Sequence, residues 1–468
     1  MTTHSCHRAA VLAATIWLAG CTTFSTDGGF STVAVVAKEK LAKDLTWARN
    51  DADRSTIASR VAVLLASPLS VDDAVQLALL NNPGLQADFA ALGIAEADMV
   101  SASRLANPGF SLLRTRRGDE IEVERGIHFN LMRLLTLPLA VKMESQRFEQ
   151  AKGAAVNAAI VLANDTRKAY YQALAAEETL RYTRQVRDVA EASAELARRM
   201  AAVGNWSRLQ QSREQGFYAD AALNVARAEQ ARVRAREALT RHLGLWGGQL
   251  QYTLPPRLPD LPKDVNEQPD IEKRAMLSRL DVAAAKQSAL ALADNLGLSQ
   301  ATRFINVLEL GGIRDSSNQQ PTRKGYEISL ELPLFDWGTA RVAKAESLYL
   351  QALNRTAETA INARSEVRER YQSYRISYDI AQHYRDEIVP IRKRVADENL
   401  LRYNGMLIGV FDLLSDARAQ IASVNGSIEA LRDFWLAESD LQMAMLGRPS
   451  ATSVGTDMMM ANDAKAGH

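Results

Sequence analysis

Apolar residues recur at steps of three, four and seven along two long stretches of the chain. From Val141 to Val203 no proline occurs, and the apolar positions fall on one face of a helix. That face carries Val156, Ile160, Ala163, Tyr170 and Leu174. At roughly 1.5 Å per residue, these 63 residues would span about 95 Å. A second stretch of 63 residues, Arg341–Tyr403, repeats the pattern, and Pro390 should kink it.

Each long helix is followed by a second helical pattern, over Asn205–Leu243 and Gly409–Leu446. Glycines at the two junctions allow the chain to reverse, so we expect two antiparallel helical hairpins. Alanine is abundant on the facing sides, so one hairpin alone would bury little apolar area. The pattern therefore favours a larger assembly, with a solvent-exposed coiled coil that encloses no channel as the alternative.

Four shorter segments alternate between apolar and polar residues with a period of two, which is typical of strands. They are Phe110–Arg116, Ile127–Met132, Phe304–Ile313 and Tyr326–Leu332. Gly118-Asp119 and Asp315–Asn318 supply turn residues, so each pair of segments predicts one hairpin. In the last strand Glu327 and Glu331 share one face, which would line a lumen if the strand crosses a membrane.

The chain is internally duplicated. Residues 69–247 and 270–447 each contain a helix, a strand hairpin and a helical hairpin, joined by a proline-rich linker over 248–269. Ile127–Leu131 corresponds to Tyr326–Leu330 at an offset of 199. The hairpin ends match less uniquely, because Val203-Gly204 corresponds either to Asn404-Gly405 or to Ile408-Gly409.

The amino terminus is typical of a bacterial lipoprotein signal. A weakly basic start and an apolar run lead to Leu18-Ala19-Gly20-Cys21, which resembles a lipobox. This predicts that residues 1–20 are removed, that Cys21 carries a covalent lipid, and that residues 21–68 form a lipid-anchored tether with a short helix. An ordinary secretory signal is the alternative. We expect residues 448–468 to be a disordered tail.

Composition argues against several functions. The sequence has six histidines, none of which forms a close ligand pair in the mature chain, so we expect no metal site and no cofactor beyond the lipid on Cys21. A net charge of +1 gives no argument for nucleic acid, and catalytic motifs are lacking, so we expect no enzyme. The sequence has no apolar run long enough for a transmembrane helix, so any membrane crossing should use strands.

Four strands cannot close a barrel alone. An open edge would leave unpaired amides in hydrocarbon, each costing several kcal/mol, and single-chain barrels need about eight strands. Several chains would therefore have to share one barrel, of eight strands for two copies or twelve for three. A small soluble sheet that caps the helices is the alternative.

At this point the chain resembles the TolC-like outer-membrane efflux family. Leu69–Ala78 with Asn81–Leu85 is similar to the family's opening helix, and Ile328–Gly338 to its final strand and exit turn. Tyr403–Gly405 followed by Phe411–Leu414 is similar to its second helical hairpin end. In the first half, Leu134–Leu139 lacks the usual aromatic-glycine exit turn, which leaves the end of the second strand open.

The resemblance implies a mainly α-helical fold with a small transmembrane β part. It implies a homotrimer whose twelve strands form one outer-membrane barrel and whose helices form a periplasmic tunnel. The function implied is the exit duct of a tripartite efflux or export system, with an inner-membrane pump and a periplasmic adaptor as partners and outer-membrane lipid around the barrel. The rival reading is a lipid-anchored structural coiled coil in the periplasm.

The resemblance also assigns roles to particular residues. The hairpin ends, Val203-Gly204-Asn205 and Asn404-Gly405-Met406, would contact the adaptor, although a purely structural role as turns is an equal alternative. Asp412 matches an acidic position that lines the closed periplasmic opening, and Asp416 lies on the same helix face, although a solvated helix surface is an equal alternative for both. The transported substrate stays open.

Overall fold

The computed structural model describes residues 23–265, 267–301, 308–330, 335 and 337–447. The chain divides into two compact units. The first is assembled from residues 1–33, 88–155 and 281–360, and the second from 34–87, 156–280 and 361–468. Some long helices contribute to both units, and α6 (Leu131–Ala202) is one of them, since residues 131–155 belong to the first unit and residues 156–202 to the second.

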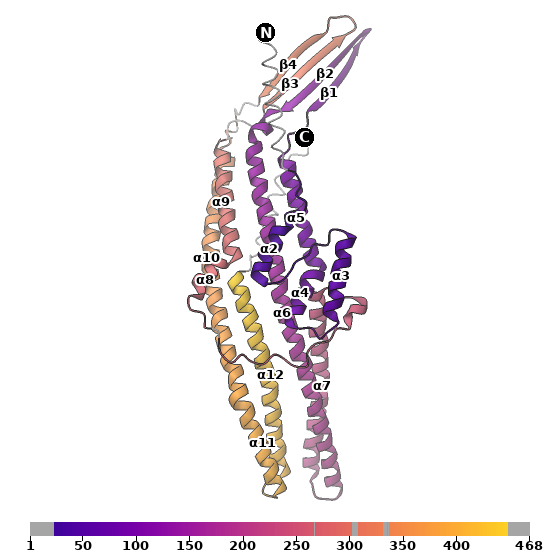
Figure 1. The fold of residues 1–468 in the computed structure, drawn as a ribbon, viewed down its shortest axis with the longest axis vertical. Helices are drawn as coiled ribbons and strands as arrows, with labels where there is room; N and C mark the ends of the chain where they lie inside the picture. Colours follow the sequence, from indigo (N-terminus) through magenta and orange to yellow (C-terminus); the bar gives the residue numbers. More distant parts are fainter. Residues whose placement is uncertain (1–22, 266, 302–307, 331–334, 336, 448–468) are drawn as a thin grey trace. The chain divides into compact units, whose positions relative to one another are not determined.

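The first unit contains a four-stranded antiparallel sheet with the order β1-β2-β3-β4. Its strands are β1 Gly109–Arg117, β2 Glu120–Asn130, β3 Leu308–Ser317 and β4 Arg323–Leu330. The central pair joins the two halves of the sequence, with Ile127 opposite Gly312 and Phe129 opposite Leu310. The two hairpin turns therefore lie at the same end of the sheet (Figure 1).

The strand boundaries differ from the predicted ones at two places. Asp315, Ser316 and Ser317 were expected to form a turn, but they belong to β3. All three pair with β2, and Asp315 also pairs with β4, so the reversal falls on residues 318–322. The second strand was expected to reach Met132, but β2 ends at Asn130. The alternating pattern continues past the end of the strand, but Asn130 caps the next helix. Its side chain accepts a hydrogen bond from the Arg133 amide at 2.8 Å at the start of α6.

The amino-terminal segment of this unit is fixed on α5 (Pro83–Ala102). Both the amide and the hydroxyl of Ser25 donate to the Glu96 carboxylate, at 2.6 and 2.5 Å, and Glu96 is buried. Phe30 meets Phe89 edge to face, with ring centroids 5.0 Å apart. In the described part of the predicted tether, 23–68, two helices occur in place of one short helix, α2 Phe30–Leu41 and α3 Asp51–Leu65, and α3 belongs to the second unit.

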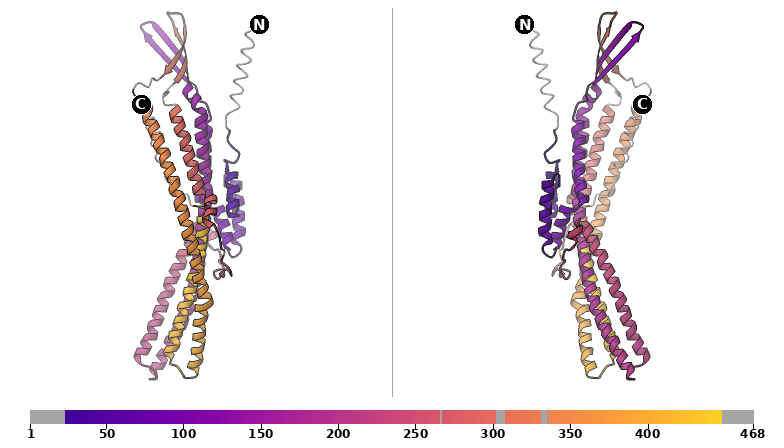
Figure 2. Two further views of the ribbon diagram at one scale, coloured as in Figure 1. Left: turned by 90° about the vertical axis from the view of Figure 1, so that its left-hand side faces the viewer. Right: turned by 90° about the vertical axis from the view of Figure 1, so that its right-hand side faces the viewer.

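The second unit contains the two predicted helical hairpins (Figures 1 and 2). The first consists of α6 and α7 (Arg208–Leu243), and the second of α11 (Val389–Asn404) and α12 (Val410–Leu446). Helix α6 has 72 residues and begins ten residues before the predicted Val141. It runs through Pro138, which lies inside the helix and near its start.

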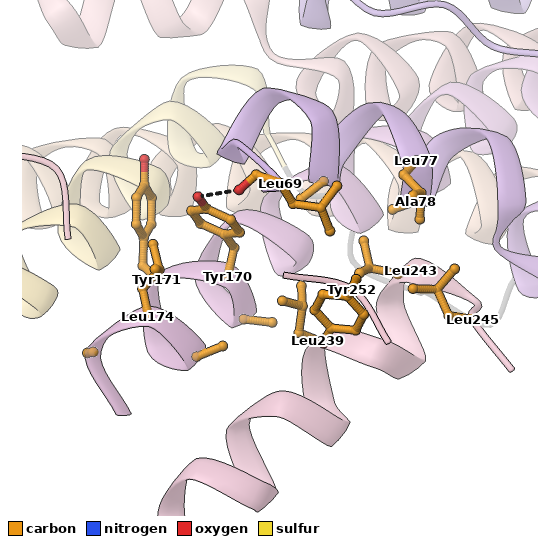
Figure 3. Packing of buried hydrophobic residues seen from close by; sticks show 14 of the residues in the cluster. Leu69, Leu77, Ala78, Tyr170, Tyr171, Leu174, Leu239, Leu243, Leu245 and Tyr252 are labelled. Atoms are coloured by element: carbon orange, nitrogen blue, oxygen red, sulfur yellow. Dashed lines mark hydrogen bonds between the residues drawn. The ribbon is translucent and has the colours of Figure 1, made fainter. Parts of the chain in front are cut away.

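One core of this unit surrounds α4 (Val71–Asn81), where buried side chains from α4, α6, α7 and the segment after α7 meet (Figure 3). Leu69 is fully buried, and its carbonyl accepts the Tyr170 hydroxyl at 2.8 Å. Burial also raises the pKa of Tyr170 to about 12, because the phenolate would lose its hydration there. The family-like segment that begins at Leu69 is thus a packing motif.

The Asn81-Asn82 pair has a structural explanation. The Asn81 amide donates to the carbonyls of Leu243 and Gly244, at 3.0 and 2.8 Å, and the Asn82 amide donates to His242 at 3.0 Å. These bonds satisfy carbonyls at the end of α7 that lack partners within the helix. Gly244 has φ +66°, and a Cβ there would meet the Asn81 carbonyl at 2.7 Å, so only glycine permits this approach.

A second core forms between α8 (Ile271–Ser278), the later part of α10 (Thr339–His383) and α12. Phe434 is completely buried there and contacts Tyr374 and Tyr378. The Tyr378 hydroxyl donates to the Pro262 and Lys263 carbonyls, at 3.0 and 2.8 Å. The proline-rich segment is therefore fixed to the helices at this point.

The irregularity expected from Pro390 takes the form of a π-helix, η2, over Tyr384–Ile388, between α10 and α11. Proline has no amide hydrogen, and its ring would collide with the carbonyl four residues earlier, that of Asp386. The wider π turn accommodates both effects. Gly426 on α12 makes room for the Tyr384 ring, because a Cβ there would lie 2.7 Å from its hydroxyl.

Among the residues that the structure describes, no helix is both long and apolar enough to cross a bilayer.

Candidate channel wall and hairpin ends

The sheet sorts its side chains into two chemically different faces. Directly paired residues point to the same side, and neighbours along a strand point to opposite sides. All six acidic residues of the four strands fall on one side, which we call the acidic face. They are Glu120, Glu122, Glu124, Glu309, Asp315 and Glu327. Only two strand cations, Arg117 and Arg323, accompany them.

The opposite side, which we call the apolar face, carries large side chains in successive cross-strand layers. Its exposed members among the described residues are Phe110, Leu112, Ile127, Phe129, Leu310, Tyr326 and Ile328, whereas Ile121 and Val123 on the same face are half-buried. In the single chain Tyr326 has 80% of its surface accessible. Contiguous exposed apolar area of this kind marks a surface that meets another protein or a lipid.

Glu327, predicted to face a lumen, lies on the acidic face opposite Gly311. Glu331, given the same role, lies outside the described residues. The other five carboxylates of the acidic face were not among the predicted lumen residues. Glu122 and Glu124 alternate with Val123 and could have been read as part of a strand, whereas Asp315 was assigned to a turn.

Near the turns the acidic face forms a recess of about 360 Å³. Arg323 contacts the carboxylates of Asp315 and Glu122, at 3.0 and 3.6 Å. Asn318 ties the two hairpin turns together, since its side chain accepts the Ile121 amide at 2.8 Å and donates to the Asp119 carbonyl at 2.8 Å. The two hairpin turns are thus linked through one side chain.

The sheet has two open edges in the described part of the chain. Strands β1 and β4 each pair with one neighbour only, so one side of each backbone presents free amides and carbonyls. Nine residues of β1 are all exposed. Long exposed edges next to apolar side chains are sites where another strand adds.

The first hairpin end is a Schellman motif. Gly204 has φ +81°, the Asn205 amide donates to the Met200 carbonyl at 2.9 Å, and the Gly204 amide donates to Ala201 at 3.1 Å. Val203 projects with 69% of its surface accessible. A Cβ on Gly204 would meet no atom within 4 Å, so the constraint there is the backbone conformation.

The second hairpin end repeats this motif with a different residue. Gly405 was expected to supply the positive φ, but its φ is −80°, and Met406 has φ +60° instead. The Leu407 amide donates to Arg402 at 2.8 Å and the Met406 amide to Tyr403 at 2.9 Å. Met406 is therefore the structural equivalent of Gly204. Their numbers differ by 202, which agrees with neither of the two correspondences predicted from the sequence. The Met406 side chain is 93% accessible.

Asp412 and Asp416, predicted to share one helix face, have different surroundings. Asp412 lies exposed in the first turn of α12, where a negative charge is favoured by the helix dipole. Asp416 is half-buried and accepts a hydrogen bond from the Asn399 amide of α11. Only Asp412 is thus directed away from its own hairpin.

A buried ion pair that the sequence did not reveal links the two hairpins. Glu214 of α7 is 4% exposed, accepts the Ser193 hydroxyl of α6 at 2.9 Å and contacts Arg418 of α12 at 3.1 Å. The Arg418 guanidinium also lies 4.2 Å from the centre of the Phe217 ring. In sequence these residues look like part of a solvated helix surface.

Metal-binding arrangements of three or more His, Cys, Asp or Glu side chains do not occur among the described residues. Cys21, the predicted lipidation site, lies outside them.

Comparison of the fold with solved structures gives close matches over most of the chain. The outer-membrane protein VceC of Vibrio cholerae superimposes with a TM-score of 0.67 at 15% identity, covering 81% of this chain and 96% of that chain. The CmeC outer-membrane channel of Campylobacter jejuni gives 0.68 at 17% identity, covering 84% and 89%. The open state of the MtrE outer-membrane channel of Neisseria gonorrhoeae gives 0.68 at 18% identity, covering 81% and 89%.

No protein-family model and no curated protein sequence matches the chain. At these identities the likeness establishes the architecture: long helical hairpins combined with a four-stranded sheet, as in outer-membrane channels.

Proposed function

We propose that this chain, which has the TolC-like outer-membrane channel fold, is the exit duct of a tripartite efflux or export system. Three copies would join their sheets into one twelve-stranded barrel in the outer membrane. The observation that carries the proposal is the sheet, because it is acidic on one face, apolar on the other and open at both edges.

The open edges favour a barrel of several copies. In hydrocarbon every amide of β1 and β4 needs a partner, and β4 of one copy can supply it to β1 of the next. Two copies would give a barrel of eight strands, and side chains nearly fill the interior of a barrel of that size. Three copies would give a barrel of twelve strands, which leaves an open lumen. In such a barrel the apolar face would meet lipid, and the acidic face would line the lumen with a net of four negative charges from the described strand residues of each chain.

Lipidation at Cys21 would add a second attachment to the outer membrane. The segment that follows is already held against the first unit, through the hydrogen bonds from Ser25 to Glu96. A lipid on Cys21 would therefore sit a few residues from a fixed point. The chain would need no cofactor other than this lipid, and we propose no catalytic residues.

The helical hairpins would form the periplasmic tunnel and reach the adaptor. Their ends expose Val203 at one tip and Met406 and Leu407 at the other. Together with Gly204, Asn205, Asn404 and Gly405, these residues would form the adaptor-contacting surface. Asp412 would contribute one carboxylate per chain to the periplasmic opening, whereas Asp416 would mainly hold α11 to α12. Energy would come from an inner-membrane pump.

A lipid-anchored coiled coil without channel activity is the second candidate. It would explain the helices and the predicted lipobox. It gives no reason for an exposed apolar sheet face backed by six carboxylates, so the channel accounts for more of the molecule.

The proposal is tested with the full chain, extracted from membranes in mild detergent. We expect trimers by chemical crosslinking and by mass measurement, and ion conductance after insertion into planar bilayers. Ile127→Pro, which removes an amide from the central ladder, should abolish both, whereas Ile361→Asn on an exposed helix surface should abolish neither. A wild-type protein that is monomeric and forms no conducting pore would refute the channel.

A further inference from the structure

The apolar face of the sheet also carries most of its cations. Five of the seven basic residues in the four strands are on this face, without one carboxylate. They are Arg114, Arg116, Arg125, Arg314 and Lys324. The segregation is complete for the acids and nearly complete for the bases, so charge is separated across the thickness of the sheet.

Three of these cations form a continuous line across the strands, which we call the cation row. Arg125 is directly opposite Arg314, and Arg314 is directly opposite Lys324. Like charges in such positions destabilise a sheet, because their Cβ atoms are only about 4.5–5.5 Å apart. Arg125 donates to the Ser316 hydroxyl at 3.2 Å, and none of the three forms an ion pair within the described chain. The row lacks the anion that would offset its repulsion.

The cation row has a defined position along the strands. Two apolar layers lie on the helix side of it, Phe129–Leu310–Ile328 and then Phe110–Ile127–Tyr326, and the hairpin turns lie on the other side. In hydrocarbon an Arg or Lys on a barrel exterior costs about 2–4 kcal/mol at the midplane and about 0–1 near the interface. In a membrane barrel the row would thus mark the outer edge of the hydrocarbon.

We propose that the cation row binds the phosphate groups of anionic lipid in the outer leaflet. This inference rests on the proposed channel function. The ligand must place acyl chains against Tyr326 and Leu112 and an anion against the adjacent guanidinium and ammonium groups. A phosphorylated glycolipid meets both requirements, and Arg is well suited to phosphate because its planar fork donates two parallel hydrogen bonds.

A free phosphate or an acidic protein satisfies only the charge. Neither would cover the two apolar layers that continue the same surface. The reversed charge of the other face supports the assignment, since the carboxylates there would repel an anionic lipid.

The test uses the full-length trimer in nanodiscs of phosphatidylcholine to which fluorescent diphosphoryl lipid A is added. We compare wild type with the triple variant Arg125→Gln, Arg314→Gln, Lys324→Gln. At roughly fivefold per cation near a charged surface, the association constant should fall on the order of a hundredfold. The matched control neutralises the two cations of the acidic face, Arg117→Gln with Arg323→Gln, and should bind lipid A like wild type.

Three results would overturn the inference: equal binding by the triple variant, equal binding of dephosphorylated lipid A by wild type, or full displacement of the lipid by inorganic phosphate. Trimer assembly and conductance of each variant are measured in parallel. If the triple variant does not assemble, Arg314→Gln alone should reduce lipid A binding about fivefold. Unchanged lipid A binding by Arg314→Gln would then refute the proposed role of the cation row. If the wild-type protein conducts ions but does not bind lipid phosphate, only the lipid-binding proposal is refuted. If it neither assembles nor conducts ions, the proposed channel function is refuted.

Discussion

At the scale of single residues, the strongest conformational signal is Met406, a non-glycine residue with positive φ at an exposed turn. The left-handed conformation costs an ordinary residue about 1–2 kcal/mol relative to glycine. Its duplicate at the other hairpin end is Gly204, which has no such cost. The strain is retained with an accessible thioether side chain at the point where a partner would dock, and this favours a contact role for Met406.

Met406→Gly should raise stability by about 0.5–1 kcal/mol, because the turn loses its strain, and should nevertheless lower efflux. Urea unfolding and a drug or ion resistance assay measure the two effects. Gly204→Ala is the mirror control and should destabilise its turn by about 1 kcal/mol. If Met406→Gly is stabilising and efflux is unchanged, the side chain makes no functional contact.

Tyr170 predicts an alkaline limit to stability. Burial raises its pKa from 10.0 to about 12, so the folded state holds the proton longer than the unfolded state. The stabilisation is complete below pH 10 and is lost as pH rises towards about 12. Unfolding midpoints measured across this range should fall more steeply in wild type than in Tyr170→Phe. Parallel curves would contradict a buried, proton-holding Tyr170.

At the scale of elements, the spacing of apolar residues and the position of Pro390 explain why most helices could be predicted from the sequence. The helical hairpins follow from apolar steps of three and four, and Pro390 indicated the irregularity that η2 resolves. The predicted boundaries were wrong at two places. Asn130 caps α6 although it lies in an alternating segment, and Asp315 pairs in β3 although it lies in a segment rich in turn-forming residues. The acidic face could not be predicted, because it depends on how the strands pair with one another and no single strand sequence specifies that register.

The pairing of Glu214 with Arg418 belongs to this scale, because it links α7 to α12. Glu214→Ala should destabilise the second unit by about 1–3 kcal/mol, a value reduced from that of fully buried pairs since Arg418 is partly exposed. Arg418→Met in the Glu214→Ala background should recover part of the loss, as a double-mutant cycle in urea would measure. Strictly additive losses would show that the two side chains do not interact.

At the scale of the whole molecule, the sorted sheet connects sequence to function. The same four strands supply an apolar face, an acidic face and two open edges, and the helical hairpins have the arrangement found in outer-membrane channels. Sequence resemblance anticipated this architecture. The transported substrate is not encoded in it, since a carboxylate-lined lumen attracts cations in general and selects no particular molecule.

Lumen charge predicts ion selectivity. Neutralising Glu122, Glu124 and Glu327 to Gln should lower the cation-to-anion permeability ratio by several-fold, because three of the six carboxylates per chain are lost. Reversal potentials in planar bilayers under a salt gradient give the ratio. Glu358→Gln, an exposed carboxylate on α10, should leave it unchanged. An unaltered ratio in the triple variant would place the acidic face outside the conduction path.

The one-residue alternation of the sheet has an evolutionary consequence. Adding or deleting a single codon early in β3 would rotate every later side chain of that strand to the opposite side, turning Asp315 to the apolar face and Arg314 to the acidic face. Changes in pairs would preserve the sides, and the reversal at 318–322 could vary in length more freely. Insertions and deletions among natural variants should therefore be sparse in the strands and concentrated in that loop.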